Sequence, residues 1–243
     1  MSRGHTEKNR MQYQFPIFEN LCPSWEKIAP LGVRCVYPKG AQILNLESHV
    51  NGVYYVIEGS VEIMLYTLQG PEKVLFYVGP GCIFGEVSCF VNAESGESDE
   101  ASVRARADCV VVYFTREQIE GTIANQYPQL LLELIRATAY KVRMYGVLLR
   151  DSLSSDHFIR VCKMLVYLTR FKAGPLVAGQ NRVAFQPEMT QNDMARLMGI
   201  HRVTVTKAVS RLKQMGIILR FSKSSLVIAD FPGLCQLIEK SEL

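Results

Sequence analysis

The spacing of apolar residues changes near Phe114, and this change constrains the fold more than any other feature of the chain. From about Gly32 to Phe114, short runs rich in Val, Ile, Tyr and Phe are separated by glycines. Short strands separated by turn signals are typical of a small sandwich or barrel. After Phe114 the apolar residues recur at three- to four-residue steps, which indicates helices. We therefore expect an α+β protein with a β-domain first and helices after it.

A long helix is predicted from Pro128 to about Leu153, because proline is tolerated in a first helical turn. One stripe of this helix recurs at steps of three and four residues, which is the spacing of a dimer seam. The alternative is a core helix lying on the β-domain, and we expect both uses on different faces. The residues assigned to the seam are Leu131, Leu134, Thr138, Val142, Tyr145 and Leu149.

The segment 151–156 is polar and Ser-rich, which predicts a hinge, and 157–172 has helical spacing. Further along, Thr190 followed by Asp193 approximates a capping box that would start a helix running to Met198. Gly199 would end that helix, and a second would run from about His201 to Gln214. A short β-hairpin with a polar turn at 222–225 follows. This order is the winged helix-turn-helix plan.

In that plan, the exposed residues at the start of the second helix face base edges in the major groove. The hairpin's turn carries a lysine suited to phosphate contact. The predicted DNA-contacting residues are His201, Arg202, Val203, Thr204, Thr206, Lys207 and Lys223.

The charge distribution agrees with this prediction. Residues 1–150 hold 14 Lys/Arg and 16 Asp/Glu, whereas residues 151–243 hold 13 Lys/Arg and 7 Asp/Glu. A basic C-terminal part beside a slightly acidic N-terminal part indicates a polyanionic partner for the C-terminal part.

Several other classes of protein are disfavoured. No apolar run approaches a membrane span, and the first ten residues lack the apolar core of a signal peptide, so we expect a cytoplasmic protein without a membrane partner. Phosphate-loop, nucleophile-elbow and zinc-protease motifs are missing, so an enzyme is not expected. The seven cysteines are scattered without paired spacing, which argues against a metal site.

The chain resembles the Crp/Fnr superfamily of transcription regulators. The likeness rests on Lys39-Gly40, 55–59, 79–86 and the helical segment 190–207. The resemblance implies a β-roll of the cyclic-nucleotide-binding type, a dimerising helix, a winged helix-turn-helix, double-stranded DNA as ligand and RNA polymerase as partner. It also implies three regions, namely 1–120 for effector sensing, 121–153 for dimerisation and the hinge, and 154–243 for DNA binding.

The sequence departs from those members of the Crp/Fnr superfamily whose effector is known. Where cyclic-nucleotide binders carry an Arg-Ser step for the phosphate, this chain has acids within 97–101, so cyclic AMP is not expected. Cys22 and Cys35 do not form the compact group of iron–sulfur members. His49 is the one histidine in the β-roll, and a solvated position explains it more simply than haem ligation.

A narrower resemblance is to CprK-type regulators of reductive dehalogenation, through 70–77 and 140–142. It implies a small anionic or phenolic effector, such as a halogenated aromatic, between the β-roll and the long helix. The candidate effector contacts are Tyr77, Phe84, Gly85, Glu86 and Lys141. Two structural roles would also explain a lysine at position 141. Its side chain would extend past the edge of the helix to solvent, or it would set the register between two paired helices.

We expect no cofactor other than this effector. Two alternatives remain on the same scaffold. One is a redox- or haem-based gas sensor, and the other is a DNA-binding module whose sensor no longer responds. The sequence does not identify the effector, the target genes, the redox state of the cysteines, or activation as opposed to repression.

Overall fold

The structure is a computed structural model that describes residues 16–45, 51–65, 73–92, 101–152, 156–173 and 181–241. The chain divides into two compact units, with the division inside the long helix between Tyr145 and Gly146. We call Pro16–Tyr145 the β-unit and Gly146–Leu243 the helical unit. The three regions predicted from the sequence, 1–120, 121–153 and 154–243, are divided at other positions than these two units. They stay predictions.

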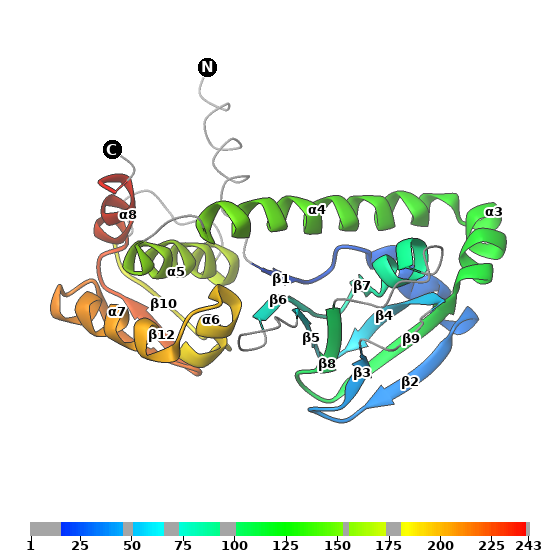
Figure 1. Ribbon diagram of the computed structural model, residues 1–243, viewed down its shortest axis with the longest axis horizontal. Helices are drawn as coiled ribbons and strands as arrows, with labels where there is room; N and C mark the ends of the chain where they lie inside the picture. Colours follow the sequence, from blue (N-terminus) through cyan, green and yellow to red (C-terminus); the bar gives the residue numbers. More distant parts are fainter. Residues whose placement is uncertain are drawn as a thin grey trace, which may run out of the picture. The chain divides into compact units, whose positions relative to one another are not determined.

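The β-unit is built from two sheets (Figure 1). The five-stranded sheet has the order β1-β6-β5-β8-β3, and the four-stranded sheet has the order β2-β9-β4-β7. β1 pairs in parallel with β6, and the other pairs are antiparallel. The strands are β1 (Ile17–Phe18), β2 (Val33–Tyr37), β3 (Gln42–Leu44), β4 (Gly52–Glu58), β5 (Val61–Leu65), β6 (Lys73–Val78), β7 (Ile83–Phe84), β8 (Ala101–Ala105) and β9 (Cys109–Thr115).

Four short helical segments accompany these strands, namely η1 (Pro23–Leu31), η2 (Ser88–Asn92), η3 (Gln118–Ile123) and α3 (Ala124–Gln126). The turn after β4 shows why the strands are separated by glycines. Gly59 follows β4 with a φ of 79°, and a Cβ there would lie 2.1 Å from the Asp108 carbonyl oxygen. Only glycine fits such a turn without displacing the backbone.

One apolar cluster of the β-unit joins the four-stranded sheet to the helices. Trp25 is fully buried, packs edge-on against Phe114 at 5.4 Å between ring centroids, and donates its indole N–H to the Leu130 carbonyl at 3.1 Å. Leu130 lies on α4 (Pro128–Ser152), whose bounds agree with the predicted helix. The first turns of α4 are thereby attached to the β-unit through apolar burial and one buried hydrogen bond.

The helical unit contains a three-stranded sheet of order β10-β12-β11 and four further helices. Its elements are α5 (His157–Ala173), β10 (Val183–Phe185), α6 (Gln191–Met198), α7 (Arg202–Gln214), β11 (Ile218–Ser222), β12 (Ser225–Ile228) and α8 (Phe231–Glu239). α5 is buried along most of its length, and α6, α7 and α8 supply further apolar residues to this second core. Among the described helices, none is long and apolar enough to cross a membrane.

Candidate DNA-binding and effector sites

The helix-turn-helix begins with the capping box that the sequence indicated. The Thr190 hydroxyl accepts the Asp193 backbone N–H at 3.1 Å, and the Asp193 carboxylate accepts the Thr190 N–H at 2.8 Å. At the other end of α6, Gly199 adopts a left-handed φ of 62°, and the Ile200 N–H donates to Ala195. Both ends of α6 are therefore fixed by local hydrogen bonds.

α7 has one buried face and one exposed basic face. Val205, Ala208, Val209 and Leu212 are buried in the helical unit. Of the predicted DNA contacts, His201, Arg202, Val203, Thr206 and Lys207 are exposed on the other side, whereas Thr204 is half-buried. Val203 is 62% exposed, so its isopropyl group is available for contact with a partner.

The predicted wing is present as the β11–β12 hairpin. Lys223 lies in its turn and is exposed. The turn is held by the Ser222 hydroxyl, which accepts the Ser225 N–H at 3.1 Å. The structure therefore places the wing lysine and the exposed face of α7 within one unit. A phosphate backbone is the partner that such exposed cations suit.

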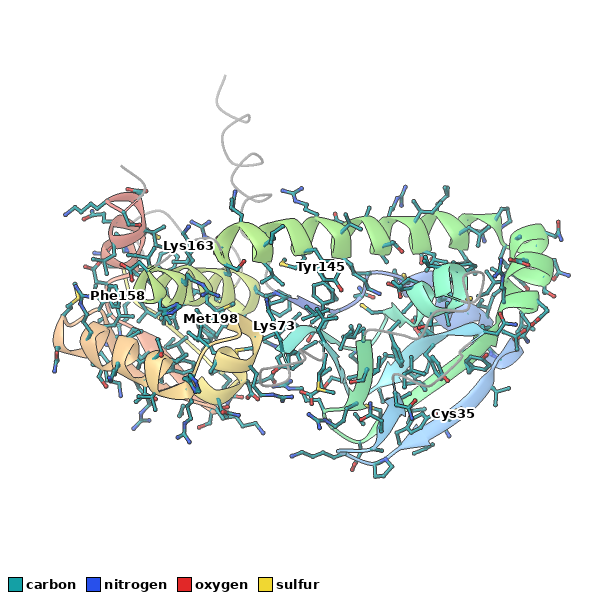
Figure 2. All side chains as sticks on the ribbon, viewed as in Figure 1. Cys35, Lys73, Tyr145, Phe158, Lys163 and Met198 are labelled. Atoms are coloured by element: carbon teal, nitrogen blue, oxygen red, sulfur yellow. The ribbon has the colours of Figure 1, made fainter. Side chains whose placement is uncertain are left out.

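A residue that the sequence analysis missed connects α5 to the helix-turn-helix. Arg160 on α5 donates to the carbonyl of Met198, the last residue of α6, at 2.7 Å. The Arg211 guanidinium of α7 lies 4.1 Å from the ring centroid of Phe158, which is also on α5. Figure 2 labels Phe158 and Met198 in this unit. Neither Arg160 nor Arg211 belongs to a recognisable sequence motif, so these contacts could be identified only from the fold.

A half-buried carboxylate joins the end of α4 to α5. Asp151 lies 3.7 Å from the Lys163 ammonium and accepts the Tyr167 hydroxyl proton at 3.4 Å. Burial raises the pKa of Asp151, although Lys163, Arg150, Tyr167 and Arg160 oppose that rise. The carboxylate is a fixed part of the helical unit, close to the predicted hinge, of which residues 153–155 lie outside the described part.

Two of the predicted effector contacts form a buried ion pair. Lys141 is 5% exposed, and its ammonium donates to Glu86 at 2.7 Å and to the Ile83 carbonyl at 2.8 Å. Gly85, with a φ of 88°, makes the bend that sets Glu86 beside the helix. A cation and an anion from elements 55 residues apart in sequence therefore neutralise each other inside the β-unit.

The two aromatic residues among the predicted effector contacts lie on different sheets. Phe84 is fully buried on β7 and stacks on Tyr54 with ring centroids 5.0 Å apart, and Tyr54 also contacts Tyr113 at 4.9 Å. Tyr77 is buried on β6, and the Arg106 guanidinium lies 4.3 Å from its ring centroid. Burial raises the pKa of Tyr54, so its phenol stays neutral at physiological pH.

The structure corrects the predicted seam on α4 at one residue. Leu134 is 8% exposed and lies in the core of the β-unit, so it is not available to a second chain. The buried stripe of α4 consists of Leu130, Leu134, Ala137, Lys141 and Met144. Its steps are of four and three residues, and the predicted seam also combines steps of three and four, so spacing alone could not separate the two stripes.

The exposed stripe of α4 contains a residue that the sequence analysis did not assign. Ile135 is 63% exposed, as are Val142 at 63% and Leu149 at 64%. Tyr145 is 43% exposed, and its ring packs against Phe76 at 4.7 Å (Figure 2). With Ile135 in place of Leu134, the stripe is Leu131, Ile135, Thr138, Val142, Tyr145 and Leu149, of which Leu131 and Thr138 are half-buried and the other four are exposed.

Four thiols in the β-unit are buried, those of Cys22, Cys82, Cys89 and Cys109, and Cys35 is half-buried. Burial raises the pKa of Cys22 to about 12 and that of Cys82 to about 11, which keeps both protonated and weakly nucleophilic. Among the described residues there is no cluster of three or more His, Cys, Asp or Glu that could hold a metal ion. His49 and residues 97–100, used in the arguments on haem and cyclic nucleotides, lie outside the described residues.

Comparison with known proteins matches both parts of the chain. Residues 34–126 match the cyclic nucleotide-binding domain, and residues 159–237 match the Crp-like helix-turn-helix domain. A CRP-like cAMP-activated global transcriptional regulator of Mycobacterium tuberculosis is 29% identical over 200 residues, which cover 82% of this chain and 85% of that protein.

Solved structures show the same fold at low identity. A CprK variant complexed with the compound OCPA has a TM-score of 0.75 at 17% identity, covering 92% of this chain and 97% of that one. A CooA mutant from Carboxydothermus hydrogenoformans has a TM-score of 0.73 at 19% identity, covering 87% and 90%.

Proposed function

Because the chain belongs to the Crp/Fnr family of transcription regulators, with an effector-binding domain and a helix-turn-helix, we propose that it is an effector-gated homodimer. In this proposal it binds an A/T-rich palindrome at promoters, with RNA polymerase as its protein partner. The observation that carries it is the exposed start of α7, where Arg202, Val203 and Lys207 stand free of the core. Regulators of this family are not enzymes.

The base preference follows from Val203. In the major groove an isopropyl side chain has no hydrogen bond to offer, and the thymine methyl is the base group that it can contact. A carboxylate at this place would instead accept from cytosine N4. Arg202 and Lys207 are available for guanine or phosphate. This supports half-sites rich in A·T pairs, with centres about one helical turn apart for a dimer.

Dimerisation through α4 is supported by the exposed stripe. Ile135, Val142 and Leu149 recur every seven residues, and Leu131, Thr138 and Tyr145 occupy the intervening positions. Such a pattern buries a continuous seam against a second helix, and the β-branched residues Ile135 and Val142 in the first set favour two strands. The Thr138 hydroxyl donates to the Leu134 carbonyl at 3.0 Å, so this polar group is satisfied without a partner chain.

The effector that we propose is a small anionic or phenolic molecule. The Lys141–Glu86 pair supplies a buried cation whose present counter-ion is a side chain of the protein itself. A phenolate or carboxylate that replaced Glu86 would keep the cation neutralised while changing how β7 is attached to α4. The buried ring of Phe84 and the half-buried ring of Tyr54, which stack on each other, favour an aromatic molecule.

Two similar proteins suggest two different classes of effector, cyclic AMP and an aromatic anion. The name of the Mycobacterium tuberculosis regulator states that cAMP activates it, and the CprK structure holds OCPA. The acids at 97–101 oppose a cyclic phosphate by charge, since the family's phosphate-binding step is cationic at this place. The same sequence argument therefore favours the aromatic anion over cAMP for this chain.

A thermal-shift experiment tests the effector. The full chain is heated with halogenated phenols, aryl acetic acids, benzoate and cyclic AMP, each at millimolar concentration. A ligand at 100 times its Kd stabilises the folded protein by about 2.7 kcal/mol, which moves the midpoint by several degrees. Stabilisation by an aromatic anion supports the proposal. Stabilisation by cyclic AMP at micromolar concentration would overturn it.

A further inference from the structure

One hydrogen bond connects the two helices of the DNA-binding motif through their side chains. The Thr206 hydroxyl on α7 donates to the Gln191 carboxamide oxygen on α6 at 2.9 Å. Thr206 is exposed on the face of α7 that carries Val203, and Gln191 is the first residue of α6. The bond therefore lies at the surface that would face DNA.

Gln191 is held in place by its surroundings. It directly follows Thr190, whose backbone N–H and hydroxyl both donate to Asp193 at 2.8 Å. The capping box fixes the backbone on which Gln191 stands, and α6 packs against α7 in the same unit. The Gln191 side chain therefore starts from a fixed backbone position, from which its carboxamide oxygen reaches Thr206.

The bond changes what Thr206 can offer to a base. A hydroxyl has one hydrogen, and here that hydrogen is used within the protein. A free threonine hydroxyl could donate to N7 of a purine or to guanine O6. With its proton donated to Gln191, Thr206 presents its methyl group and the remaining lone pair. Those groups suit the thymine methyl and the amino groups of adenine or cytosine.

We propose that Gln191 is a specificity-determining positioning residue, which takes the single hydroxyl proton of Thr206 and so excludes guanine from the position that Thr206 faces. Gln191 acts through Thr206 and needs no base contact of its own. This inference rests on the proposed function, because it assumes that the exposed face of α7 enters the major groove. It adds a second determinant of base preference beside Val203, on a different helix.

The test is a binding selection on random duplexes with the full chain, at low ionic strength so that phosphate contacts sustain binding without an effector. The variants are Gln191→Leu, Gln191→Glu, Thr206→Val, and Gln191→Leu combined with Thr206→Val. Asn192→Ala, one residue along α6, is the matched control. Each variant yields a base preference at every position of the half-site and an overall affinity.

Gln191→Leu should raise acceptance of guanine at one position of each half-site by roughly 2- to 10-fold, the range expected for one net hydrogen bond. Gln191→Glu keeps an acceptor for the Thr206 proton, so it should retain the base preference while lowering affinity for all sequences through repulsion of phosphate. The double variant should lose the gain in guanine, because the gain needs the hydroxyl. Asn192→Ala should leave the preference unchanged.

The selection distinguishes a failure of the proposed function from a failure of the role assigned to Gln191. If the unmodified protein selects no sequence, the proposed function itself fails. If it selects a site but Gln191→Leu gives the same preference at every position, Gln191 has no role in specificity. If guanine acceptance rises equally with and without the Thr206 hydroxyl, the change does not pass through Thr206 and the inference is overturned.

Discussion

Val203 and Lys141 have side chains whose chemistry does not match their surroundings, since one is an apolar residue in water and the other a cation in the core. Val203 is 62% exposed, and Lys141 is 5% exposed. Leaving an isopropyl group in water or an ammonium in the protein interior costs free energy unless something compensates. For Lys141 the compensation is Glu86 and the Ile83 carbonyl. For Val203 we propose that it is a thymine methyl.

Val203→Glu tests that assignment. The carboxylate can accept from cytosine N4, so preference should move from an A·T to a C·G pair at one position of each half-site. A wrong base should then cost about 1–3 kcal/mol, measured by competition between duplexes that differ at that pair. A uniform loss of affinity across all duplexes would mean that Val203 does not contact a base.

Lys141→Met tests the buried ion pair. The Glu86 carboxylate would lose its cation while staying buried, and the free energy of unfolding should fall by roughly 3–5 kcal/mol. Adding Glu86→Leu should recover much of the loss, because the second charge is then removed. Thermal or urea unfolding of the full chain provides the measurement. A double variant no more stable than Lys141→Met would show that the pair is not coupled.

At the scale of elements, α4 carries two stripes with the same spacing and different environments. The stripe with Leu134 is buried in the β-unit, and the stripe with Ile135 is exposed. The sequence predicted a helix with a seam but combined members of both stripes. The one-residue displacement depends on which face packs against the sheets, and a helical repeat contains no information on that choice.

Ile135→Asp should therefore dissociate the dimer without unfolding the β-unit. A charge in the middle of an apolar seam should cost at least about 2 kcal/mol, or roughly a 30-fold rise in Kd. Sedimentation across micromolar concentrations measures it, and circular dichroism confirms folding. Arg136→Asp, exposed one residue further along α4, is the control that should remain dimeric. Equal dissociation by both variants would contradict the seam.

The junction of α4 and α5 should respond to pH through Asp151. Because burial raises its pKa, the folded protein favours the protonated form, so this group's contribution to stability is present at low pH and is lost as pH rises through the raised pKa. Asp151→Asn cannot ionise. The difference in unfolding midpoint between the variant and the unmodified protein should therefore change in the variant's favour as the pH rises from below the usual pKa of an aspartate to neutral pH. A constant difference would contradict the buried ionisation.

At the scale of the whole molecule, the sequence predicted those features that depend on local pattern. The capping box at Thr190, the glycine at the end of α6, the wing hairpin and the span of α4 all follow from neighbouring residues, and all are confirmed. Contacts between distant segments were not predictable in this way. Arg160 with Met198 and Thr206 with Gln191 join residues 38 and 15 positions apart, and no periodicity marks them.

In the proposed complex, two copies of this chain present α7 to adjacent turns of the same duplex. The most direct measurement is an unbiased selection of random duplexes by the full chain, followed by sedimentation of the selected complex. We predict a palindrome with A/T-rich half-sites, their centres about 10 base pairs apart, bound by two chains. A selected site that is G/C-rich, lacks two-fold symmetry or binds a single chain would contradict the account.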